Sequence, residues 1–570
     1  MSGVAAIVIG ASGDEIGVAR LDTTGAVLDR GSVAGEDLPG FVGQNGTGRW
    51  IWSDTAYWYP RLLDAGVRVA RCRDLRLCHA ILRDSALVAH PQAVRAAQEW
   101  DVSADAAQDE SAPGLFTLVD GPVAQGPPHG LDAALAEFAR QREAVASSPE
   151  RGRLDLLCAA ESAGALVAAE MRAAGLPWDV AEHERILDEV LGPRPPGGGP
   201  PRRMAELAIE IRTHLGDAGA SIDAPAKLLR SLHRVGVPAQ TTSKWELGRF
   251  EHPVIAPLLE YKRHSRLLSA NGWAWLDEWV HEGRFRPVYV PAGVVTGRWA
   301  SSGGGALQIP RMLRRAVRAD DGWTFVVADV AQLEPRVLAG MSSDLALAGA
   351  AHGRDLYAGI VDSGAVATRA EAKVAMLGAM YGATTGESGR LVPRLRRTYP
   401  RAMTLVDEAA RAGESGEVVS TWLGRSCPPA SPGWLRAQRV AAGETGTAAE
   451  RDRARRAAGD RGRFTRNFVV QGTAAEWALA WLGEVRSRLD ALGCVPPDEA
   501  APRSGPALGN RPHLAFFLHD ELIVHTPRRF ADAAADIVRG AAASAGRLLF
   551  GRFPIDFPLD LKITPTAAKE

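Results

Sequence analysis

The sequence predicts a multidomain α+β protein, and three observations support that fold class. Its 570 residues suffice for three or four domains, and a hydrophobic content of 46% allows each to bury a core. Apolar residues recur at helical spacing over 155–285, whereas the apolar runs at 325–329 and 516–525 are typical of strands. Segments rich in proline and glycine at 121–130 and 191–203 separate these regions.

The first 150 residues are predicted to open with a β-hairpin made of 4–9 and 16–21, followed by helices. Three later helices are predicted over 154–171, 204–215 and 257–280. The segment 495–512, rich in proline, glycine and alanine, is predicted to be an exposed excursion.

The most informative segment is F-F-L-H-D-E-L-I-V-H at 516–525, which predicts two short strands joined at His519-Asp520-Glu521. Carboxylates beside apolar surface are costly unless a positive charge compensates them, and a divalent cation is the usual partner.

A second strand, 325–329, ends in Asp329 and leads past Val330 into a helix that has Pro335 in its first turn. If both strands deliver an aspartate to one sheet edge, the pair would form a two-metal site for phosphoryl displacement. The plainer alternative, in which Asp329 caps a helix and Asp520 is a turn residue, is equally open for either residue alone.

A helical stripe is predicted from Arg369, Lys373, Leu377 and Tyr381, which follow one another at steps of four. It offers two cations for a polyphosphate and a flat surface for a base and sugar. The alternative is an ordinary amphipathic surface helix. Only six lysines stand among 66 Lys and Arg residues, so a lysine inside the stripe favours a phosphate site.

With these segments in view, the chain resembles the family A DNA polymerases, of the DNA polymerase I type. Residues 329–336, 369–382 and 518–521 resemble motifs A, B and C of that family. Further matches keep the family order, namely Thr296-Gly297-Arg298 with Leu307-Gln308-Ile309-Pro310, Thr421 to Arg425, and Arg466-Asn467 with Gln471 to Ala475.

The resemblance implies a ribonuclease H-like N-terminal domain followed by a right-hand polymerase with helical thumb, antiparallel-sheet palm and helical fingers. The implied domains are a 3′–5′ exonuclease-like domain at 1–150, thumb and palm entry at 151–285, palm with motif A at 286–350, fingers with motif B at 351–425, and palm with motif C at 426–570. No D-x-E pair stands near the start, so the exonuclease-like domain is expected to be inactive. A 5′ nuclease domain is expected to be absent, so any repair role would need one in trans.

The resemblance also implies site residues. Two Mg²⁺ ions, which Mn²⁺ could replace, would be held by Asp329, Asp520 and the backbone carbonyl of Val330. Contacts with the incoming nucleotide would come from Arg369, Lys373, Leu377, Tyr381, Glu334 and Gln332. Among these, Lys373 would also be catalytic and Glu334 would reject a 2′-hydroxyl. Contacts with DNA would come from Arg298, Gln471, His519, Arg466 and Asn467.

Several residues depart from the family pattern: Val330-Ala331 for Tyr-Ser, Pro335 for Leu, Met376-Leu377 for Asn-Phe, Tyr357 for His and Phe517 for Gln. Because the aspartate pair, Arg369 and Lys373 are retained, we expect an active but slow or specialised enzyme.

The expected function is a template-directed DNA polymerase that adds deoxynucleotides to a primer 3′ end and releases pyrophosphate. Three alternatives stay open: a bifunctional enzyme with a working 3′–5′ exonuclease, a non-catalytic DNA-binding scaffold with a relic palm, and a single-subunit RNA polymerase. If Glu334 excludes a 2′-hydroxyl, the substrates are deoxynucleotides, which argues against the RNA polymerase alternative. Trp273, Trp275 and Trp279 would be core side chains or, less commonly, surfaces on which bases stack.

Charge and cysteine content indicate which binding partners and which cellular compartment to expect. A net charge of −1 is unexpected for a DNA-binding protein, but arginines cluster locally, most densely at 451–466, a run that would contact DNA or form a solvated or disordered loop. The five cysteines include no C-x-x-C pair, which argues against zinc and disulfides and fits a reducing cytoplasm. No signal or membrane segment is evident, so we expect a monomer in the bacterial cytoplasm, associated with the nucleoid.

Overall fold

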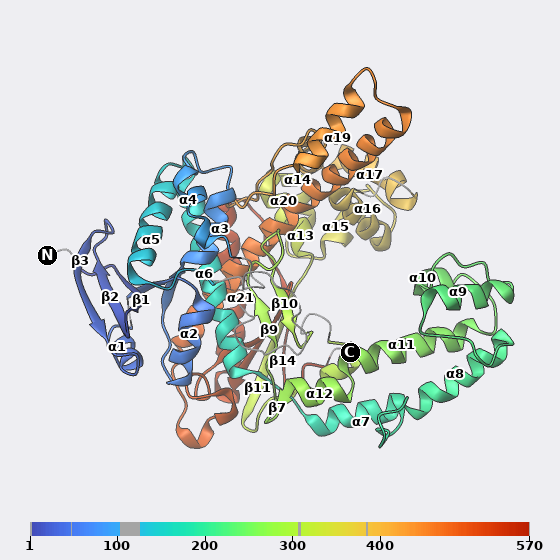
Figure 1. Ribbon diagram of the computed structural model, residues 1–570, viewed down its shortest axis with the longest axis horizontal. Coiled ribbons are helices and arrows are strands. Elements are labelled where there is room, and N and C mark those ends of the chain that lie inside the picture. The colour runs from blue at the N-terminus through green and yellow to red at the C-terminus, as the bar shows by residue number, and fades with distance from the viewer. Residues whose placement is uncertain (1–2, 47, 103–125, 306–308, 383–385, 569–570) are drawn as a thin grey trace. The chain divides into compact units, whose positions relative to one another are not determined.

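The computed structural model describes residues 3–46, 48–102, 126–305, 309–382 and 386–568. The chain divides into two compact units (Figure 1). The first unit consists of Met1–Ala174, Val288–Ser302 and Asp321–Thr564, and the second of Gly175–Pro287, Gly303–Asp320 and Pro565–Glu570.

The N-terminal part of the first unit is built on a five-stranded sheet with the order β3-β2-β1-β4-β5. Its strands are β1 (Ala6–Ser12), β2 (Glu15–Leu21), β3 (Val27–Val33), β4 (Arg49–Trp52) and β5 (Arg71–Asp74). β1, β2 and β3 are antiparallel, whereas β4 and β5 run parallel to β1. The predicted hairpin is therefore confirmed. The chain then adds three strands in a region that was predicted to be helical, because β3 is almost wholly exposed and β4 and β5 are only four residues each.

Helices cover this sheet, since parallel strands need crossover connections. They are α1 (Leu38–Gln44), α2 (Thr55–Asp64), α3 (Leu75–Asp84), α4 (Gln92–Ala96), α5 (Leu131–Ala146) and α6 (Arg151–Ala174). Part of 495–512 also packs here: Leu508 is 0% exposed and lies in the same core as Trp50 and Trp52. The prediction of an exposed excursion was wrong for the part that contains Ala507 and Leu508, because two apolar side chains suffice to anchor it, whereas residues 496–499 are exposed.

The second sheet of this unit has the order β12-β13-β11-β14, and all neighbours are antiparallel. Its strands are β11 (Trp323–Val330), β12 (His513–Leu518), β13 (Glu521–Pro527) and β14 (Leu559–Thr564). Helix α21 (Ala531–Phe550) packs against β11, β13 and β14. The two predicted strand regions are confirmed, and β9 (Val288–Val290) pairs with β10 (Ala300–Gly303) nearby in the chain.

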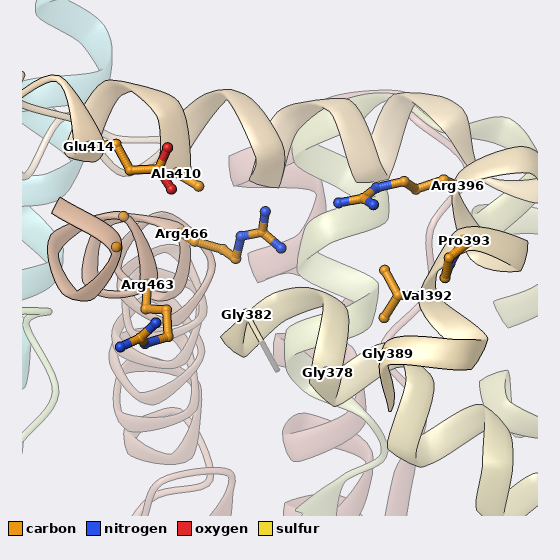
Figure 2. Close-up of a pocket in the computed structure, with 12 residues that line it drawn as sticks. Gly378, Gly382, Gly389, Val392, Pro393, Arg396, Ala410, Glu414, Arg463 and Arg466 are labelled. Atoms are coloured by element: carbon orange, nitrogen blue, oxygen red, sulfur yellow. The ribbon is translucent and has the colours of Figure 1, made fainter. Parts of the chain in front are cut away.

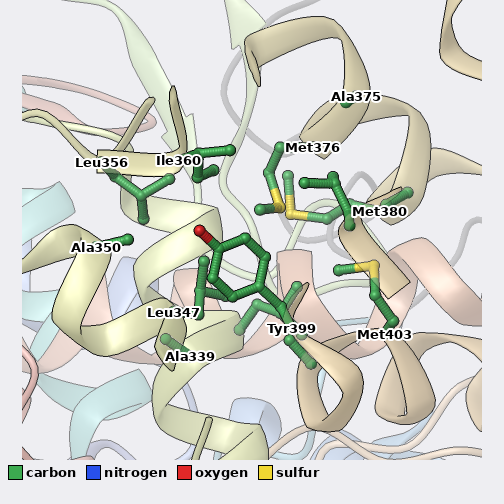
Figure 3. Close-up of a cluster of buried hydrophobic side chains, with 14 of the residues drawn as sticks. Ala339, Leu347, Ala350, Leu356, Ile360, Ala375, Met376, Met380, Tyr399 and Met403 are labelled. Carbon is green, nitrogen blue, oxygen red and sulfur yellow. The ribbon is translucent and has the colours of Figure 1, made fainter. Parts of the chain in front are cut away.

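A helical cluster follows β11. It contains α13 (Leu333–Ser342), α14 (Leu345–Ala351), α15 (Leu356–Asp362), α16 (Arg369–Tyr381), α17 (Gly386–Thr398), α18 (Pro400–Glu414) and α20 (Ala448–Asp490). Figure 3 shows its core, where Met376, Met380 and Met403 surround Tyr399. Helix α16 buries Met376 and Met380, whereas Arg369, Lys373 and Tyr381 of the predicted stripe are exposed and Leu377 is half-buried.

Helix α16 is well delimited by its sequence. Thr368 and Glu371 form a capping box at its start, and Gly382 ends it with a left-handed backbone at φ +74°. The predicted helix is therefore confirmed, and its N-terminal end carries Arg369 while its C-terminal end carries Tyr381.

The densest arginine run lies in a helix, not a loop. Helix α20 is 43 residues long and begins with a capping box formed by Thr447 and Glu450. Helix α19 (Pro432–Ala442) precedes it and packs against it. The disordered-loop alternative for 451–466 was wrong, because alanine and arginine are good helix formers despite the high charge.

The second unit is mostly helical, as predicted. Its helices are α7 (Val180–Leu191), α8 (Arg202–Leu215), α9 (Pro225–Arg234), α10 (Lys244–Leu247), α11 (Ile255–Asn271) and α12 (Trp273–Trp279), beside a small sheet of β6 (Leu176–Pro177), β8 (Arg284–Phe285) and β7 (Val280–His281). Trp275 is buried between Trp178 and Phe285, with ring centroids at 5.3 and 4.9 Å. Trp273 is buried as well, so for both residues the core interpretation is confirmed.

Within the described ranges, no helix combines the length and the apolar character that crossing a membrane requires. The five cysteines are free, and only Cys494 is exposed.

Candidate active site

Three carboxylates lie on one rung at the edge of the second sheet. Asp329, near the end of β11, pairs in register with Glu521 on β13 and with Asp560 on β14. Side chains of directly paired residues project from the same face, with Cα atoms about 5 Å apart. Glu521 is 2% exposed and Asp329 is half-buried, so their like charges raise the free energy unless a cation lies nearby.

Asp520 is held at the same edge by the main chain. Its amide donates to the carbonyl of Leu518 at 2.7 Å and closes a γ-turn centred on His519, whose φ of +57° is strained for a non-glycine residue. The amide of Val330 donates to the carbonyl of Asp520 at 2.9 Å. The structure thus brings Asp329, Val330 and Asp520 together, although nearly two hundred residues separate the strands.

The donor set suits magnesium. In the part of the chain that the structure describes, no group of three or more His, Cys, Asp or Glu side chains forms a ready-made metal cage. Mg²⁺ in phosphoryl-transfer sites is bound through one or two carboxylates plus substrate phosphates and water, not through an all-protein cage. Two aspartates beside a backbone carbonyl, in a rung rich in negative charge, fit that mode of binding.

Glu334, at the start of α13, connects three segments. It forms an ion pair with Arg298 and accepts a hydrogen bond from the hydroxyl of Tyr381. Tyr381 also hydrogen-bonds with Gln471 on α20, and burial together with Glu334 raises the pKa of Tyr381. The C-terminal end of the α16 stripe is therefore fixed beside the end of β11.

His519 lies within electrostatic reach of this group. Desolvation by the surrounding protein and the positive charge of Arg298 lower the pKa of His519, while Glu334 opposes that shift. At neutral pH the imidazole is therefore neutral, so it can exchange hydrogen bonds with a ligand without a strong charge of its own.

The other end of the stripe is organised by Asp355. Arg369 forms an ion pair with Asp355 at 2.8 Å and lies over the ring of Tyr357, 5.5 Å from its centroid. Gln332 donates a side-chain hydrogen bond to Asp355 at 3.0 Å, from a left-handed backbone at φ +50°. Burial opposes ionisation of Asp355, but the hydrogen bond and charge of Arg369 and the backbone hydrogen bonds from Ala358 and Tyr357 together outweigh it, so the pKa of Asp355 lies below its usual value. Lys373 is exposed one turn along the stripe.

Three residues that differ from the family pattern make defined contacts in the structure. Leu377 is half-buried against the core of Figure 3. Tyr357 supports Arg369, and burial raises the pKa of its hydroxyl to about 12. Phe517 packs edge-on against Trp299, with centroids 5.3 Å apart.

Arg466 and Asn467 lie deeper than the resemblance implies. Figure 2 shows a cavity between α16, α17, α18 and α20, into which Arg466 and Arg396 point. Arg466 donates to the carbonyl of Ala379 at 2.9 Å and forms an ion pair with Asp407, to which Arg396 also donates. Among the described residues, the buried Oδ1 of Asn467 has no hydrogen-bond partner. Arg466 therefore ties α16 to α18 and α20. Leu307 and Gln308 lie outside the described residues.

The N-terminal sheet carries its own pair of buried carboxylates. Asp54 and Asp74, which follow β4 and end β5, are 2% and 0% exposed. Arg76 forms an ion pair with Asp54 at 2.8 Å, and burial followed by the charge of Asp54 raises the pKa of Asp74 to about 6. Strand β1 adds no carboxylate to this site. Glu161 on α6 forms an ion pair with Arg425.

Sequence reasoning missed Asp560 and the part played by Asp355. Asp560 gains its place only because β14 pairs with β11, and nothing in the local sequence D-L-K-I-T indicates that pairing. Asp355 stands in a recognisable D-L-Y segment, but its contact with Arg369 depends on how α15 and α16 pack.

Comparison with known proteins agrees with the motifs. The profile of DNA polymerase family A matches residues 202–565. The thermostable DNA polymerase I of Thermus filiformis is 27% identical over 352 residues, covering 56% of this chain and 36% of that protein. DNA polymerase I of Chloroflexus aurantiacus is 29% identical over 324 residues, covering 52% and 31% respectively. The chain thus spans about a third of the length of these relatives.

A solved structure shares the fold. The polymerase domain of Pol1 from M. smegmatis, in complex with DNA primer-template and dNTP, superposes with a TM-score of 0.66 and 17% identity. The match covers 100% of this chain and 96% of that one. Since the family profile matches well over half of the sequence, the chain belongs to DNA polymerase family A.

Proposed function

We propose that the protein is a template-directed DNA polymerase that adds deoxynucleotides to a primer 3′ end. The observation that carries this proposal is the hydrogen bond between Val330 and Asp520, which joins the ends of β11 and the β12–β13 turn and so gathers two aspartates at one sheet edge. Relatives named DNA polymerase I, and a solved relative bound to primer-template and dNTP, support it.

In the proposed reaction, the primer 3′-hydroxyl gives up its proton to water, its oxygen bonds to the α-phosphorus, the bond from that phosphorus to the bridging oxygen breaks, and pyrophosphate leaves. Arg369 and Lys373 bind the triphosphate, and Lys373 can give a proton to the departing pyrophosphate. Asp329, Asp520 and the carbonyl of Val330 would hold two Mg²⁺ ions, or Mn²⁺ in their place, which when bound supply charge for activating the hydroxyl and stabilising the leaving group.

The remaining residues orient the substrates. Glu334 lies against the sugar and rejects a 2′-hydroxyl, with Tyr381 beside the templating base. Gln332 positions the phosphate-binding arginine through Asp355. Arg298, Gln471 and His519 touch the nascent pair and primer end, while Arg466 acts by holding the end of α16. Because Leu377 offers no aromatic ring to the nucleotide, turnover is slow.

We further propose that 1–150 is a ribonuclease H-like domain without exonuclease activity. Its order β3-β2-β1-β4-β5, with three antiparallel strands followed by two parallel ones, supports that assignment. Arg76 supplies beside Asp54 the positive charge that a metal ion would otherwise provide. We assign the parts of the chain that follow to the thumb, palm and fingers of a polymerase. We expect the protein to be a monomer in the bacterial cytoplasm. Robust Mg²⁺-dependent trimming of a mismatched primer end would contradict the inactivity of 1–150.

Primer extension tests the polymerase proposal. Asp329→Ala should lower extension at least about a thousandfold while primer–template affinity changes less than about threefold, because the aspartate acts on bound metal and not on DNA. Asp498→Asn is the matched control, since Asp498 is an exposed carboxylate outside the site. Loss of DNA binding together with extension would count against the metal role.

Extension with dNTPs compared with rNTPs separates a DNA polymerase from an RNA polymerase. If the unaltered chain extends no primer, the alternative of a non-catalytic DNA-binding scaffold is favoured.

A further inference from the structure

Helix α19 and the first part of α20 form a structure that we call the arginine hairpin, residues 432–463 (Figure 1). Helix α19 buries none of its residues. It is attached along one side only: the indole of Trp434 donates to the carbonyl of Ala457 at 3.2 Å, and Gln438 donates to the carbonyl of Ala454 at 2.9 Å. The other side of α19 and much of the first part of α20 face solvent.

The arginine hairpin carries a surplus of positive charge in a chain whose net charge is −1. It contains eight arginines and four acidic residues. Five of these arginines are exposed and, among the residues that the structure describes, have no carboxylate within ion-pair distance: Arg436, Arg439, Arg451, Arg453 and Arg456. Intramolecular ion pairs therefore leave much of this charge available for an outside partner.

The hairpin continues from the template end of the candidate site. Gln471 on α20 hydrogen-bonds with Tyr381, and Arg463 lies against Gly382, the residue that ends α16 (Figure 2). Arg456 and Arg451 precede Gln471 by 15 and 20 residues of continuous helix. At 1.5 Å per residue these arginines lie about 22 and 30 Å along α20 from Gln471.

We infer that the arginine hairpin binds the phosphate backbone of the template ahead of the site of synthesis. This inference rests on the proposed polymerase function, in which Tyr381 lies beside the templating base. Guanidinium groups bind phosphates through paired N–H donors, and DNA phosphates on one strand recur about every 3.4 Å of helix axis. The distances along α20 thus correspond to about 6 to 9 base pairs of DNA beyond the templating position.

The test compares two DNA probes, each a labelled primer–template, with about 3 or about 12 base pairs of duplex ahead of the templating base. The variant carries Arg451→Ala, Arg453→Ala and Arg456→Ala. For the longer probe we expect affinity to fall about tenfold and the salt slope to decrease by about 0.9 for each phosphate that the variant no longer binds. Affinity for the shorter probe should not change.

Two further variants make the result specific. Arg172→Ala, Arg547→Ala and Arg552→Ala remove three exposed arginines elsewhere in the same unit and should leave both affinities unchanged. Lysine at positions 451, 453 and 456 should restore most of the affinity for the longer probe, since phosphate contacts need charge more than geometry.

Unchanged affinity of the alanine variant for the longer probe would overturn the inference. An equal loss of affinity for both probes would also overturn it, because the effect would then not depend on DNA that reaches the hairpin. Primer extension on the shorter probe is measured alongside and should be normal in the alanine variant. If the unaltered chain binds DNA but extends neither probe, the polymerase proposal fails, whereas the binding comparison still decides whether the hairpin contacts DNA.

Discussion

At the scale of single residues, Glu334 shows how one carboxylate can organise a site. It pairs with Arg298 and accepts from Tyr381, so segments before β11 and after α15 meet at the first turn of α13. A charged residue that makes two such contacts is held in one rotamer, as the proposed exclusion of a 2′-hydroxyl by Glu334 requires.

Glu334→Ala should raise the use of ribonucleotides relative to deoxynucleotides by about tenfold or more, equivalent to about 1.4 kcal/mol of lost discrimination. Tyr381→Phe is the matched variant, because it removes only the hydroxyl that contacts Glu334 and should have a smaller effect in the same direction. The measurement is kcat/KM for dATP and ATP on one template. An unchanged ratio in Glu334→Ala would show that the carboxylate is not the gate.

At this scale the sequence locates a residue where its place depends on its own segment. Asp329 and Asp520 stand next to strand ends, which apolar runs locate well. Sequence reasoning could not find the contact between Arg369 and Asp355, or the depth of Arg466, because both depend on how helices far apart in the chain pack.

At the scale of elements, α20 buries an acid against the segment 421–425. Glu476 is 1% exposed and accepts hydrogen bonds from the hydroxyl of Thr421 and, at 2.9 Å, from the amide of Leu423. Burial raises the pKa of Glu476 from its ordinary 4.5 to about 7, although these hydrogen bonds and Arg425 oppose the shift. The acid therefore serves as a neutral bridge at low pH.

The stability of the first unit should depend on pH through Glu476. In the folded state its pKa is raised, so the folded protein holds a proton that the unfolded chain releases above pH 4.5. Stability should therefore fall as pH rises from about 5 to about 7 and then level off, by at most about 3 kcal/mol. Glu476→Gln should flatten this dependence in urea denaturation at pH 5 and pH 8.

Asp74, with a pKa raised to about 6, contributes in the same direction, so a residual slope should remain in Glu476→Gln. A slope as steep as that of the unaltered protein would contradict the assignment to Glu476.

The elements themselves were largely predictable. Strands β11, β12 and β13 and helix α16 follow from local patterns, as do the helices of the second unit. Strands β3, β4 and β5 were not predicted, because β3 is almost wholly exposed and β4 and β5 are four residues each. The break between α11 and α12 at Gly272 was not predicted either, since the apolar spacing runs through it.

At the scale of the whole molecule, a buried charge network joins the N-terminal region to α20 within the first unit. Glu170 on α6 accepts from Arg68 and Arg486 and from the hydroxyl of Tyr59. The two guanidinium groups overcome the effect of burial and hold the pKa of Glu170 well below its usual range. Segments more than 400 residues apart in the chain, from Arg68 to Arg486, are thereby locked together.

Glu170→Gln should lower the free energy of unfolding by about 3–5 kcal/mol, because it removes the carboxylate that both buried guanidinium groups share and leaves Arg68 only its ion pair with Asp490. Glu484→Gln, which removes the partly exposed partner of Arg488 on the same helix, should cost less than about 1 kcal/mol. Urea denaturation measures both, and limited proteolysis should show faster cleavage of the N-terminal region only in Glu170→Gln. Equal costs for the two variants would argue against the network.

Strand β14 begins about 230 residues after β11 ends, yet it completes the carboxylate rung by pairing Asp560 with Asp329. During translation this strand leaves the ribosome after every other strand of its sheet, so the carboxylate rung is completed only after the rest of the sheet has emerged. The rung is thus the last part of this sheet to form, and its completion depends on a strand far in sequence from β11.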